Sequence, residues 1–151
     1  RDEFYRRHCG ARLEPVLESL KKMKEKGIWL EITTLLIPTL NDDEEELKDI
    51  AQFVAALGRE TPWHVSRFYP RFKREDLPPT AVSSLRKAVE IGKLAGLKYV
   101  YSGNVPGDQN ENTYCAKCGQ RLIERCGFRI LEYHLKGNRC LKCGEPLEGI
   151  F

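Results

Sequence analysis

Four cysteines near the C-terminus occur in two identical spacings. Cys115 and Cys118 form one C-x2-C pair, Cys140 and Cys143 form another, and a glycine follows each pair. Two residues between thiolates allow a tight turn to direct both sulfurs at one ion, and the glycine lets the backbone curl so that N–H groups face sulfur. Two such pairs supply four sulfur ligands and leave no open position, so the sequence predicts a structural metal site.

The ion that suits this spacing best is zinc. Iron is the alternative, because rubredoxin-type sites use the same paired knuckles, and paired or free thiols are the interpretation without a metal. Cys9 and Cys126 lie outside both pairs; we expect Cys126 to be a free thiol and Cys9 a free or packed thiol. We expect His134 to be a surface or hairpin residue rather than a further ligand.

The composition and the cysteine spacing indicate the class of protein and the cellular compartment in which this site occurs. The chain has 151 residues, of which 41% are apolar and 31% charged, as in a soluble globular protein. No run of 18 apolar residues exists, and Arg1 to Arg7 lacks an apolar core, so we expect neither a membrane span nor a secretory signal. Paired C-x2-C cysteines are typical of a reducing compartment, so we expect a cytoplasmic protein. A net charge of +3 with dispersed basic residues argues against nucleic acid as a partner.

The cysteines need a small β unit to position them. Residues 120–124 and 128–134 have the pattern of short strands with a turn at Gly127, within a predicted zinc-ribbon domain of residues 113–151. About forty residues bury too little surface to fold alone, and metal binding of ~10–16 kcal/mol can supply the deficit. The polar, turn-rich residues 104–112 are predicted to form a linker.

Residues 1–103 repeat the order helix, glycine, strand three times. The predicted helices cover residues 11–26, 42–57 and 80–95, and the predicted strands cover residues 28–37, 63–69 and 97–102. Asp42 with Glu45 matches a capping box, and Thr80 is the predicted N-cap of the third helix. Alternating helices and apolar strands predict an α/β fold with a parallel sheet joined by crossovers.

Three such units do not close a core, because parallel strands are covered on both faces. Either another chain covers the sheet or residues before Arg1 are missing. We favour the second alternative and expect this chain to be a fragment. Polar residues within the strands are candidates for function: alternation places His64 and Ser66 on one face and Val65 and Arg67 on the other. Structural hydrogen bonding is the competing interpretation for His64, Arg67 and Glu31. Asn104 suits a turn, and Trp29 and Trp63 suit packing.

Several segments resemble one enzyme family. Residues 31–42 (EITTLLIPTLND) resemble the strand-to-helix segment of radical SAM enzymes of the glycyl-radical-activating type. Residues 62–70 (PWHVSRFYP), 99–107 (YVYSGNVPG) and 111–115 (ENTYC), together with the terminal knuckles, resemble AmmeMemoRadiSam-system radical SAM proteins, which are related to pyruvate formate-lyase-activating enzyme. The resemblance covers nearly the whole chain but only the C-terminal part of such a protein.

This resemblance implies a fold and cofactors. The chain would supply the last three βα units of a partial (βα) barrel, followed by the zinc ribbon. The family binds SAM and a [4Fe–4S] cluster held by a C-x3-C-x2-C motif, and this sequence contains no such triple. The cluster would therefore be bound outside this chain, and this part alone is expected to be inactive. In activating enzymes an Arg, a Val and a His contact SAM near the positions of Thr33, Leu35 and Tyr69.

Two functions follow as hypotheses. The first is the C-terminal part of a radical SAM enzyme, an oxidoreductase of the activating type with an unidentified small-molecule or protein substrate. His64 and Arg67 would be its catalytic candidates, and the ribbon would serve stability or substrate docking. The second is a binding module, in which a basic ribbon surface recognises a protein or nucleic acid and the α/β part is a scaffold. A C-x3-C-x2-C motif upstream of Arg1 would favour the first.

Overall fold

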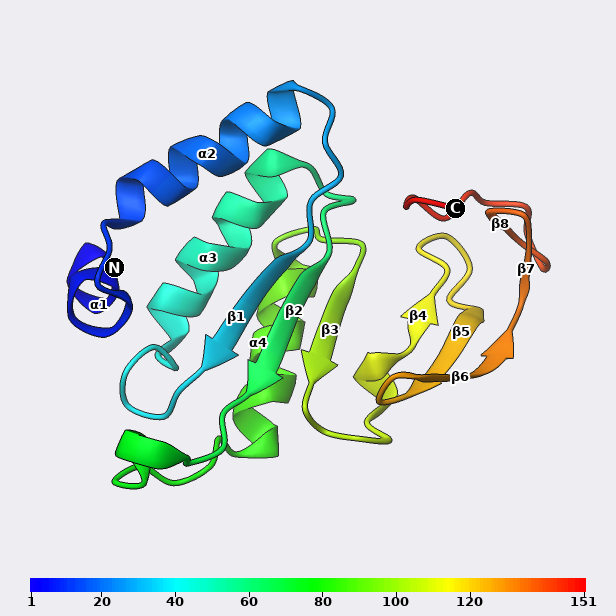
Figure 1. The fold of residues 1–151 in the computed structure, drawn as a ribbon. Helices are drawn as coiled ribbons and strands as arrows, with labels where there is room; N and C mark the ends of the chain where they lie inside the picture. The colour runs from blue at the N-terminus through cyan, green and yellow to red at the C-terminus, as the bar shows by residue number, and fades with distance from the viewer.

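The computed structural model describes residues 1–151 as a three-stranded parallel sheet with a small β unit beside it (Figure 1). The sheet has the order β1–β2–β3, and a helix precedes each strand along the chain. The elements are α2 (Leu13–Glu25), β1 (Ile32–Leu36), α3 (Glu44–Leu57), β2 (Trp63–Arg67), α4 (Val82–Leu94) and β3 (Val100–Gly103). The predicted mixed α/β order with a parallel sheet is confirmed.

Strand register decides which side chains share a face of the sheet. Thr33 pairs with His64, and His64 pairs with Tyr101 on β3. Their neighbours Trp63, Val65 and Val100 are buried and belong to the core. Because side chains alternate along a strand, Thr33, His64 and Tyr101 lie on the opposite face from that core.

Helices α3 and α4 lie together on the core face of the sheet (Figure 1). The core contains Leu36, Leu47, Ala51, Val54, Trp63, Val65, Leu85, Ala88, Val89, Ile91, Leu97 and Val100. Gly92 of α4 makes a close approach: a Cβ there would stand 2.9 Å from both Trp63 Cε3 and Val100 Cγ2. The helix can pack this near the sheet only because that position has no side chain.

Two of the predicted helix caps are wrong. The N-cap of α3 is Asp43, whose side chain accepts from the Glu46 N–H, and not Asp42. Asp42 instead accepts from the Thr39 N–H at 2.7 Å and supports a turn in which Thr39 has φ 65°. The N-cap of α4 is Ala81 rather than Thr80.

Thr80 is fully buried and joins three segments. Its hydroxyl donates to the Leu36 carbonyl at the end of β1 and accepts from the Phe68 N–H after β2. The hydroxyl therefore holds the carboxyl ends of two strands together where the sheet ladder has stopped. This long-range role explains why the residue does not cap its own helix.

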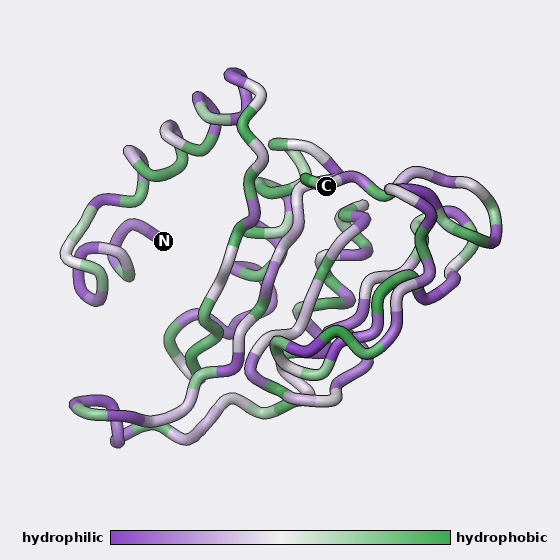
Figure 2. The backbone as a smooth tube through the Cα atoms, turned by 45° about the vertical axis from the view of Figure 1, so that its right-hand side comes forward, coloured by the Kyte–Doolittle hydropathy of each residue, from purple (hydrophilic) through white to green (hydrophobic).

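The N-terminal segment packs less tightly than the rest. A short helix α1 (Asp2–Phe4) continues into a π-helical turn η1 (Tyr5–Cys9) before α2. No residue of α2 is fully buried, although Figure 2 shows polar and apolar positions alternating along it. Two apolar side chains close to the start of β1 are also exposed: Ile28, before the strand, by 48% and Leu35, within it, by 44%. None of the helices is both long enough and apolar enough to cross a bilayer.

Residues 104–112, which the composition predicts to be a linker, pack against the α/β part. Asp108 is buried and accepts from Ser102 Oγ at 3.1 Å and from the Asn110 N–H at 2.9 Å. Arg86 of α4 reaches the other oxygen of Asp108 at 3.2 Å. A short 3-10 helix η3 (Gln109–Glu111) follows. The segment is therefore fixed to β3 and α4.

The C-terminal part forms two small antiparallel sheets. One has the order β4–β5–β6, from β4 (Thr113–Tyr114), β5 (Arg121–Cys126) and β6 (Arg129–Tyr133), and the other pairs β7 (Leu135–Lys136) with β8 (Arg139–Cys140). Gly127, with φ 58°, makes the predicted turn between β5 and β6. We refer to residues 113–151 as the ribbon.

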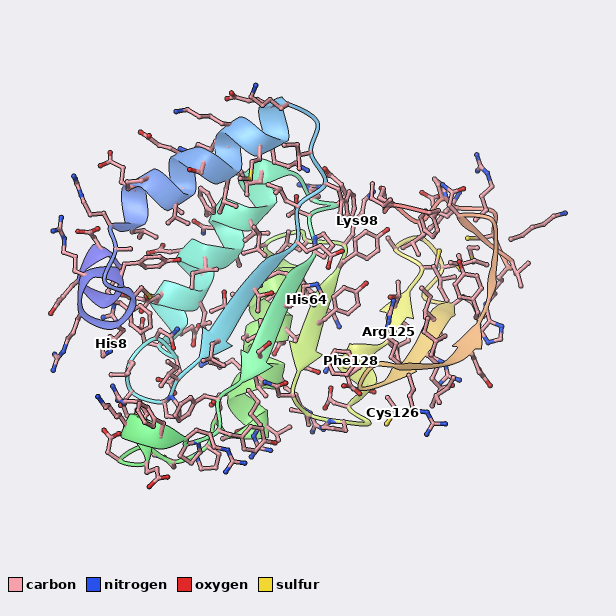
Figure 3. The ribbon with its side chains drawn as sticks, in the orientation of Figure 1. His8, His64, Lys98, Arg125, Cys126 and Phe128 are labelled. Atoms are coloured by element: carbon pink, nitrogen blue, oxygen red, sulfur yellow. The ribbon has the colours of Figure 1, made fainter.

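The ribbon packs on β3 of the parallel sheet. Tyr99 and Tyr101 belong to the same apolar cluster as Cys115, Leu122 and Leu147. Glu148 accepts from the Tyr99 hydroxyl and pairs with Lys98, whose position beside the C-terminal segment is seen in Figure 3. The interface therefore joins an apolar cluster with charged groups from both parts.

Candidate functional site

The four cysteines of the two knuckles meet in the structure. Their sulfur atoms all lie within 4.8 Å of one another. Cys115 Sγ stands 3.5 Å from Cys143 Sγ, and Cys118 Sγ stands 3.8 Å from Cys140 Sγ. A tetrahedral zinc site with Zn–S bonds of about 2.3 Å has sulfur–sulfur edges of about 3.8 Å. The two shortest sulfur–sulfur separations are thus close to that edge, and the four sulfurs together are near enough to share one ion.

The two knuckles have the same backbone geometry. In the first, the Gly119 N–H donates to the Cys115 carbonyl at 2.9 Å; in the second, the Gly144 N–H donates to the Cys140 carbonyl at 2.8 Å. Both glycines have positive φ, 69° and 75°, which costs a glycine little. The predicted curl after each pair is therefore present, and it turns each pair of sulfurs towards the other.

Electrostatics favour a cation between the sulfurs. Burial disfavours the Cys140 thiolate, but N–H groups of Cys143 and Lys142 that face its sulfur outweigh this and lower its pKa to about 7. At Cys143 the N–H of Glu145 also lowers the thiol pKa. Burial and the neighbouring sulfurs outweigh it and raise the pKa of Cys143 to about 12. Four thiolates this close repel one another, so full ionisation of the set requires a bound cation.

The donor set matches the chemistry of a closed metal site. Cys115 and Cys140 are buried, and all four ligands are sulfur, which suits zinc or iron in a tetrahedral site. An ion there would cross-link β4, the β7–β8 hairpin and the apolar cluster around Leu122. The other two cysteines, Cys9 and Cys126, are exposed and lie outside the cluster. His134 contacts Glu132 at 3.0 Å.

A second candidate region is the face of the parallel sheet opposite α3 and α4, which we call the open face. It carries Thr33 and Leu35 of β1, His64 and Ser66 of β2 and Tyr101 of β3. Thr33 and Leu35 are exposed, and the His64 side chain is 32% exposed. The sequence-predicted residues Thr33, Leu35 and His64 are therefore brought together on one accessible surface.

His64 forms a close pair with Glu31, which lies just before β1. His64 Nε2 stands 2.8 Å from Glu31 Oε2, and Trp29 Nε1 donates to Glu31 Oε1 at 3.1 Å. Burial opposes ionisation of Glu31, but the hydrogen bonds from Trp29 and His64 outweigh it and hold the pKa of the carboxyl below its ordinary value. Glu31 is thus an ionised acceptor beside the imidazole at neutral pH.

Sequence reasoning missed the residues that extend this pair towards the ribbon. The Tyr101 ring stacks on His64, with centroids 5.1 Å apart and planes 25° apart. Arg125 of β5 lies over the Tyr101 ring, 5.9 Å from its centroid, and donates to Thr113 Oγ1 at 2.6 Å. Figure 3 shows His64 on the sheet and Arg125 on the neighbouring ribbon. Strand alternation could have indicated Tyr101, but no sequence pattern links Arg125 to it.

Arg67 and Tyr69 lie together, away from the His64 pair. Arg67 Nε donates to the Thr80 carbonyl at 2.8 Å, and Arg67 Nη1 donates to the Tyr69 hydroxyl at 3.0 Å. The Tyr69 hydroxyl donates in turn to the Asn104 carbonyl at 3.2 Å, and Asn104 has φ 61° in a turn. Arg67 is therefore engaged by backbone and side-chain partners at the carboxyl end of β2, whereas the Tyr69 ring remains 43% exposed.

Comparisons with known proteins agree with this architecture. No protein-family model matches the sequence. The chain is 48% identical over 149 residues to the uncharacterized protein MJ0808 of Methanocaldococcus jannaschii; the match covers 97% of this chain and 45% of that protein's length. Among solved structures, a domain of pyruvate-formate lyase-activating enzyme from Bacteroides vulgatus superimposes with a TM-score of 0.60 at 19% identity, covering 68% of this chain and 61% of that one. This chain therefore shares the fold of a domain of pyruvate-formate lyase-activating enzyme.

Proposed function

We propose that this chain is the C-terminal part of a radical SAM enzyme, with SAM bound against the open face of the parallel sheet. The observation that carries the proposal is that face: helices cover one side of the sheet, and the other presents accessible polar groups on adjacent strands. The fold shared with a domain of pyruvate-formate lyase-activating enzyme supports it. So do the segments at residues 31–42, 62–70 and 99–107, which resemble segments of radical SAM proteins.

The open face offers contacts of the kinds that SAM needs. Ionised Glu31 and the His64 imidazole can accept hydrogen bonds from ribose or amino groups, and Thr33 can donate or accept. Leu35, at 44% exposure, offers an apolar surface. Tyr69, the third residue proposed to contact the cofactor, lies at the carboxyl end of β2, the end at which ligands bind in barrel-like sheets. Arg67 is better explained as a support for Tyr69 than as a catalytic group.

The residues of this chain do not fit a [4Fe–4S] cluster of the radical SAM type. That cluster needs three cysteines in a C-x3-C-x2-C motif, whereas the cysteines gathered here form two C-x2-C pairs. We therefore propose that the cluster is bound by residues outside this chain, in a barrel of which the present sheet would be one part.

The four-cysteine site has a separate, structural role in this proposal. We assign zinc to it, with iron as the alternative, and give the ion the role of holding the ribbon together. Thiolate ligation also fits a reducing cytoplasm, because all six cysteines are free rather than paired in disulfides.

The natural polypeptide that contains this sequence provides the test. We expect that protein, reconstituted anaerobically with iron and sulfide and then reduced with dithionite, to convert SAM to 5′-deoxyadenosine and methionine. Both products are measured by liquid chromatography. A reconstituted protein that holds iron but neither binds nor cleaves SAM would contradict the proposal.

Variants on the two faces of the sheet refine this test. Substituting Thr33→Val together with His64→Asn should raise the SAM concentration needed for half-maximal cleavage by about tenfold, since two polar contacts are removed at about 0.5–1.5 kcal/mol each. Glu45→Gln, an exposed position on α3 on the opposite side of the sheet, serves as the control and should leave it unchanged. Equal effects of both variants would place SAM elsewhere.

One observation favours a second function, recognition of a protein by the ribbon. Strand β6 is an edge strand whose residues are all exposed, including Ile130, Leu131 and Tyr133, and Phe128 projects fully from the adjoining turn. An exposed apolar edge is suited to pairing with an extended peptide. Peptides that bind the metal-loaded chain can be selected from a random library. They should not bind an Ile130→Glu variant. They should still bind Leu141→Glu, the control, because Leu141 is an exposed apolar residue outside β6.

A further inference from the structure

We propose that Glu31, Tyr101 and Arg125 are positioning residues for His64, and that the ribbon thereby forms a fixed wall of the open face. This inference rests on the proposed function, since it gives His64 a task only if a ligand binds that face. It assigns the ribbon a part in the site that neither the metal centre nor the fold comparison implies.

Glu31 fixes the tautomer of His64. A carboxylate accepts hydrogen bonds and donates none, and the pKa of Glu31 is held low, so the group is ionised at neutral pH. The 2.8 Å contact therefore requires His64 Nε2 to carry the proton. In the neutral ring Nδ1 then holds a free lone pair, and it makes no hydrogen bond within the protein. His64 is thus a proton acceptor at Nδ1.

Tyr101 fixes the plane of the imidazole. The two rings stack at 5.1 Å with planes 25° apart, and their residues are paired across β2 and β3. Burial raises the pKa of Tyr101 above its ordinary value, so its hydroxyl stays protonated. That hydroxyl lies 3.0 Å from Thr113 Oγ1, a residue of the ribbon. The ring against which His64 rests is therefore itself held from the ribbon side.

Arg125 completes the connection. Its guanidinium lies over the Tyr101 ring, and Nη1 donates to Thr113 Oγ1 at 2.6 Å and to the Glu111 carbonyl at 3.4 Å. Its backbone N–H donates to Asn112 Oδ1 at 2.8 Å. These contacts fix β5 against β4 and the residues just before it. Thr113, the first residue of β4, lies two residues before Cys115, the first candidate metal ligand. A chain of direct contacts thus runs from the ribbon to the imidazole.

The arrangement suits transfer of a proton from a ligand on the open face. A ligand O–H, N–H or S–H bond would lose its proton to Nδ1, and its electron pair would stay on the ligand. The resulting imidazolium would be balanced by the Glu31 carboxylate. The charged and titratable groups that face His64 are Glu31 before β1, Tyr101 on β3 and, beyond that ring, Arg125 on β5.

Nitrogen-15 NMR of the zinc-loaded chain tests the inference directly, because long-range proton–nitrogen spectra show which ring nitrogen is protonated. The chain has three histidines, so a His64→Asn variant assigns the relevant signals. We expect neutral His64 to be a single Nε2–H tautomer. We expect Glu31→Ala and Arg125→Ala each to add Nδ1–H signals, and Tyr101→Phe, which keeps the ring but loses the Thr113 contact, to show a smaller loss of the single tautomer.

Arg121→Ala is the matched control. Arg121 lies on the same strand as Arg125 but pairs with Glu124 and Glu132, so its removal should leave the His64 spectrum unchanged. A single Nε2–H tautomer that persists in Arg125→Ala would overturn the role of the ribbon, and a wild-type Nδ1–H tautomer would overturn the role of Glu31. Neither measurement uses SAM, so its outcome is separate from the 5′-deoxyadenosine test: failure of SAM cleavage with the expected tautomers would refute the proposed reaction and leave the positioning intact.

Discussion

At the scale of single residues, two buried threonine hydroxyl groups allow the contribution of a hydrogen bond to stability to be measured. Thr80 and Thr61 are both fully buried threonines. The Thr80 hydroxyl joins Leu36 and Phe68, whereas Thr61 Oγ1 has no hydrogen-bond partner. A threonine-to-valine substitution keeps the shape of either side chain, so the two positions separate the hydrogen bond from the packing.

We expect Thr80→Val to lower the free energy of unfolding by about 1–3 kcal/mol, because it leaves the buried Phe68 N–H without an acceptor. Thr61→Val should be neutral or slightly stabilising, since it removes a hydroxyl that is buried without a partner. Urea denaturation of both variants, followed by circular dichroism, measures the difference. Equal losses would mean that Thr80 acts through its shape alone.

Asp108 gives a residue-scale prediction about pH. Burial opposes its ionisation, but hydrogen bonds from the Asn110 N–H and side chain, Arg86 and Ser102 outweigh it and hold the pKa below the ordinary value. A lowered folded-state pKa means that the stabilisation is present above the unfolded value of about 3.9 and is lost as pH falls through the folded value. Asp108→Asn should therefore cost about 1–3 kcal/mol at pH 7.

The same substitution should cost progressively less below about pH 4, where Asp108 of the wild type takes up a proton first in the unfolded state and then, at its lowered pKa, in the folded state. Thermal unfolding of wild type and variant at matched pH values measures the difference, and loss of bound metal at low pH affects both proteins alike. The exposed Asp49→Asn on α3 is the control and should show no pH-dependent difference. A constant cost of Asp108→Asn from pH 7 to pH 3 would contradict the assignment.

Residue-scale prediction from the sequence succeeded where spacing alone decides geometry. The C-x2-C pairs predicted a four-sulfur cluster because two intervening residues leave little choice of turn. The helix caps were less well predicted. Asp42 and Asp43 are adjacent and chemically equivalent, and no sequence pattern indicates the turn at Thr39 whose N–H donates to Asp42. The sequence predicts Thr80 as the cap of its own helix, because its actual partners, Leu36 and Phe68, are distant in sequence.

At the scale of elements, the absence of a side chain at Gly92 allows α4 to pack close to the sheet. A Cβ at Gly92 would lie 2.9 Å from Trp63 Cε3 and Val100 Cγ2, both rigid core atoms. Alanine is the better helix former by about 1 kcal/mol, but overpacking a core costs about 1–3 kcal/mol. The packing term should therefore prevail.

We expect Gly92→Ala to lower the free energy of unfolding by about 1 kcal/mol net, despite its higher helix propensity. Ser83→Ala, at an exposed position of the same helix, should be neutral or stabilising by a few tenths of a kcal/mol. Chemical denaturation compares the two. A stabilised Gly92→Ala protein would show that the helix can move away from Trp63 at no cost.

Element prediction was accurate in type and order but not in length. The strand predicted at residues 28–37 is confined to Ile32–Leu36, and the one predicted at residues 63–69 ends at Arg67. Apolar residues continue before β1 and after both strands, whereas hydrogen bonding stops where the neighbouring strand stops. Sequence alone did not show which polar residues of β1 and β2 meet, because this depends on register.

At the scale of the whole molecule, the relation between the ribbon and the sheet could not be read from the sequence. Lys98, Tyr99 and Glu148 join the two parts, as do Tyr101 and Arg125. None of these pairs has a characteristic spacing, because each joins residues that are far apart in the sequence. The ribbon core includes Tyr99, the residue before β3, so loss of the metal centre should affect the structure beyond the ribbon.

Cys140→Ser tests this coupling, with Cys126→Ser as its control. Cys140 is a buried member of the sulfur cluster, whereas Cys126 is an exposed cysteine of the same ribbon. We expect wild type and Cys126→Ser to bind one zinc or iron per chain by mass spectrometry of the metal, and Cys140→Ser to lose most of it. Because apparent binding of ~10–16 kcal/mol supports a structural four-ligand site, the ribbon of Cys140→Ser should be unfolded at 25 °C.

The consequence for the sheet follows from the shared cluster. When the ribbon unfolds, the Tyr99 and Tyr101 rings lose their packing partners and the Arg125 contact, so the near-ultraviolet circular dichroism of tyrosine should decrease. The indole of Trp63, buried against α4 on the other face, should remain packed and keep its fluorescence maximum. A Cys140→Ser protein with an unchanged tyrosine signal would mean that the ribbon folds on β3 without its ion.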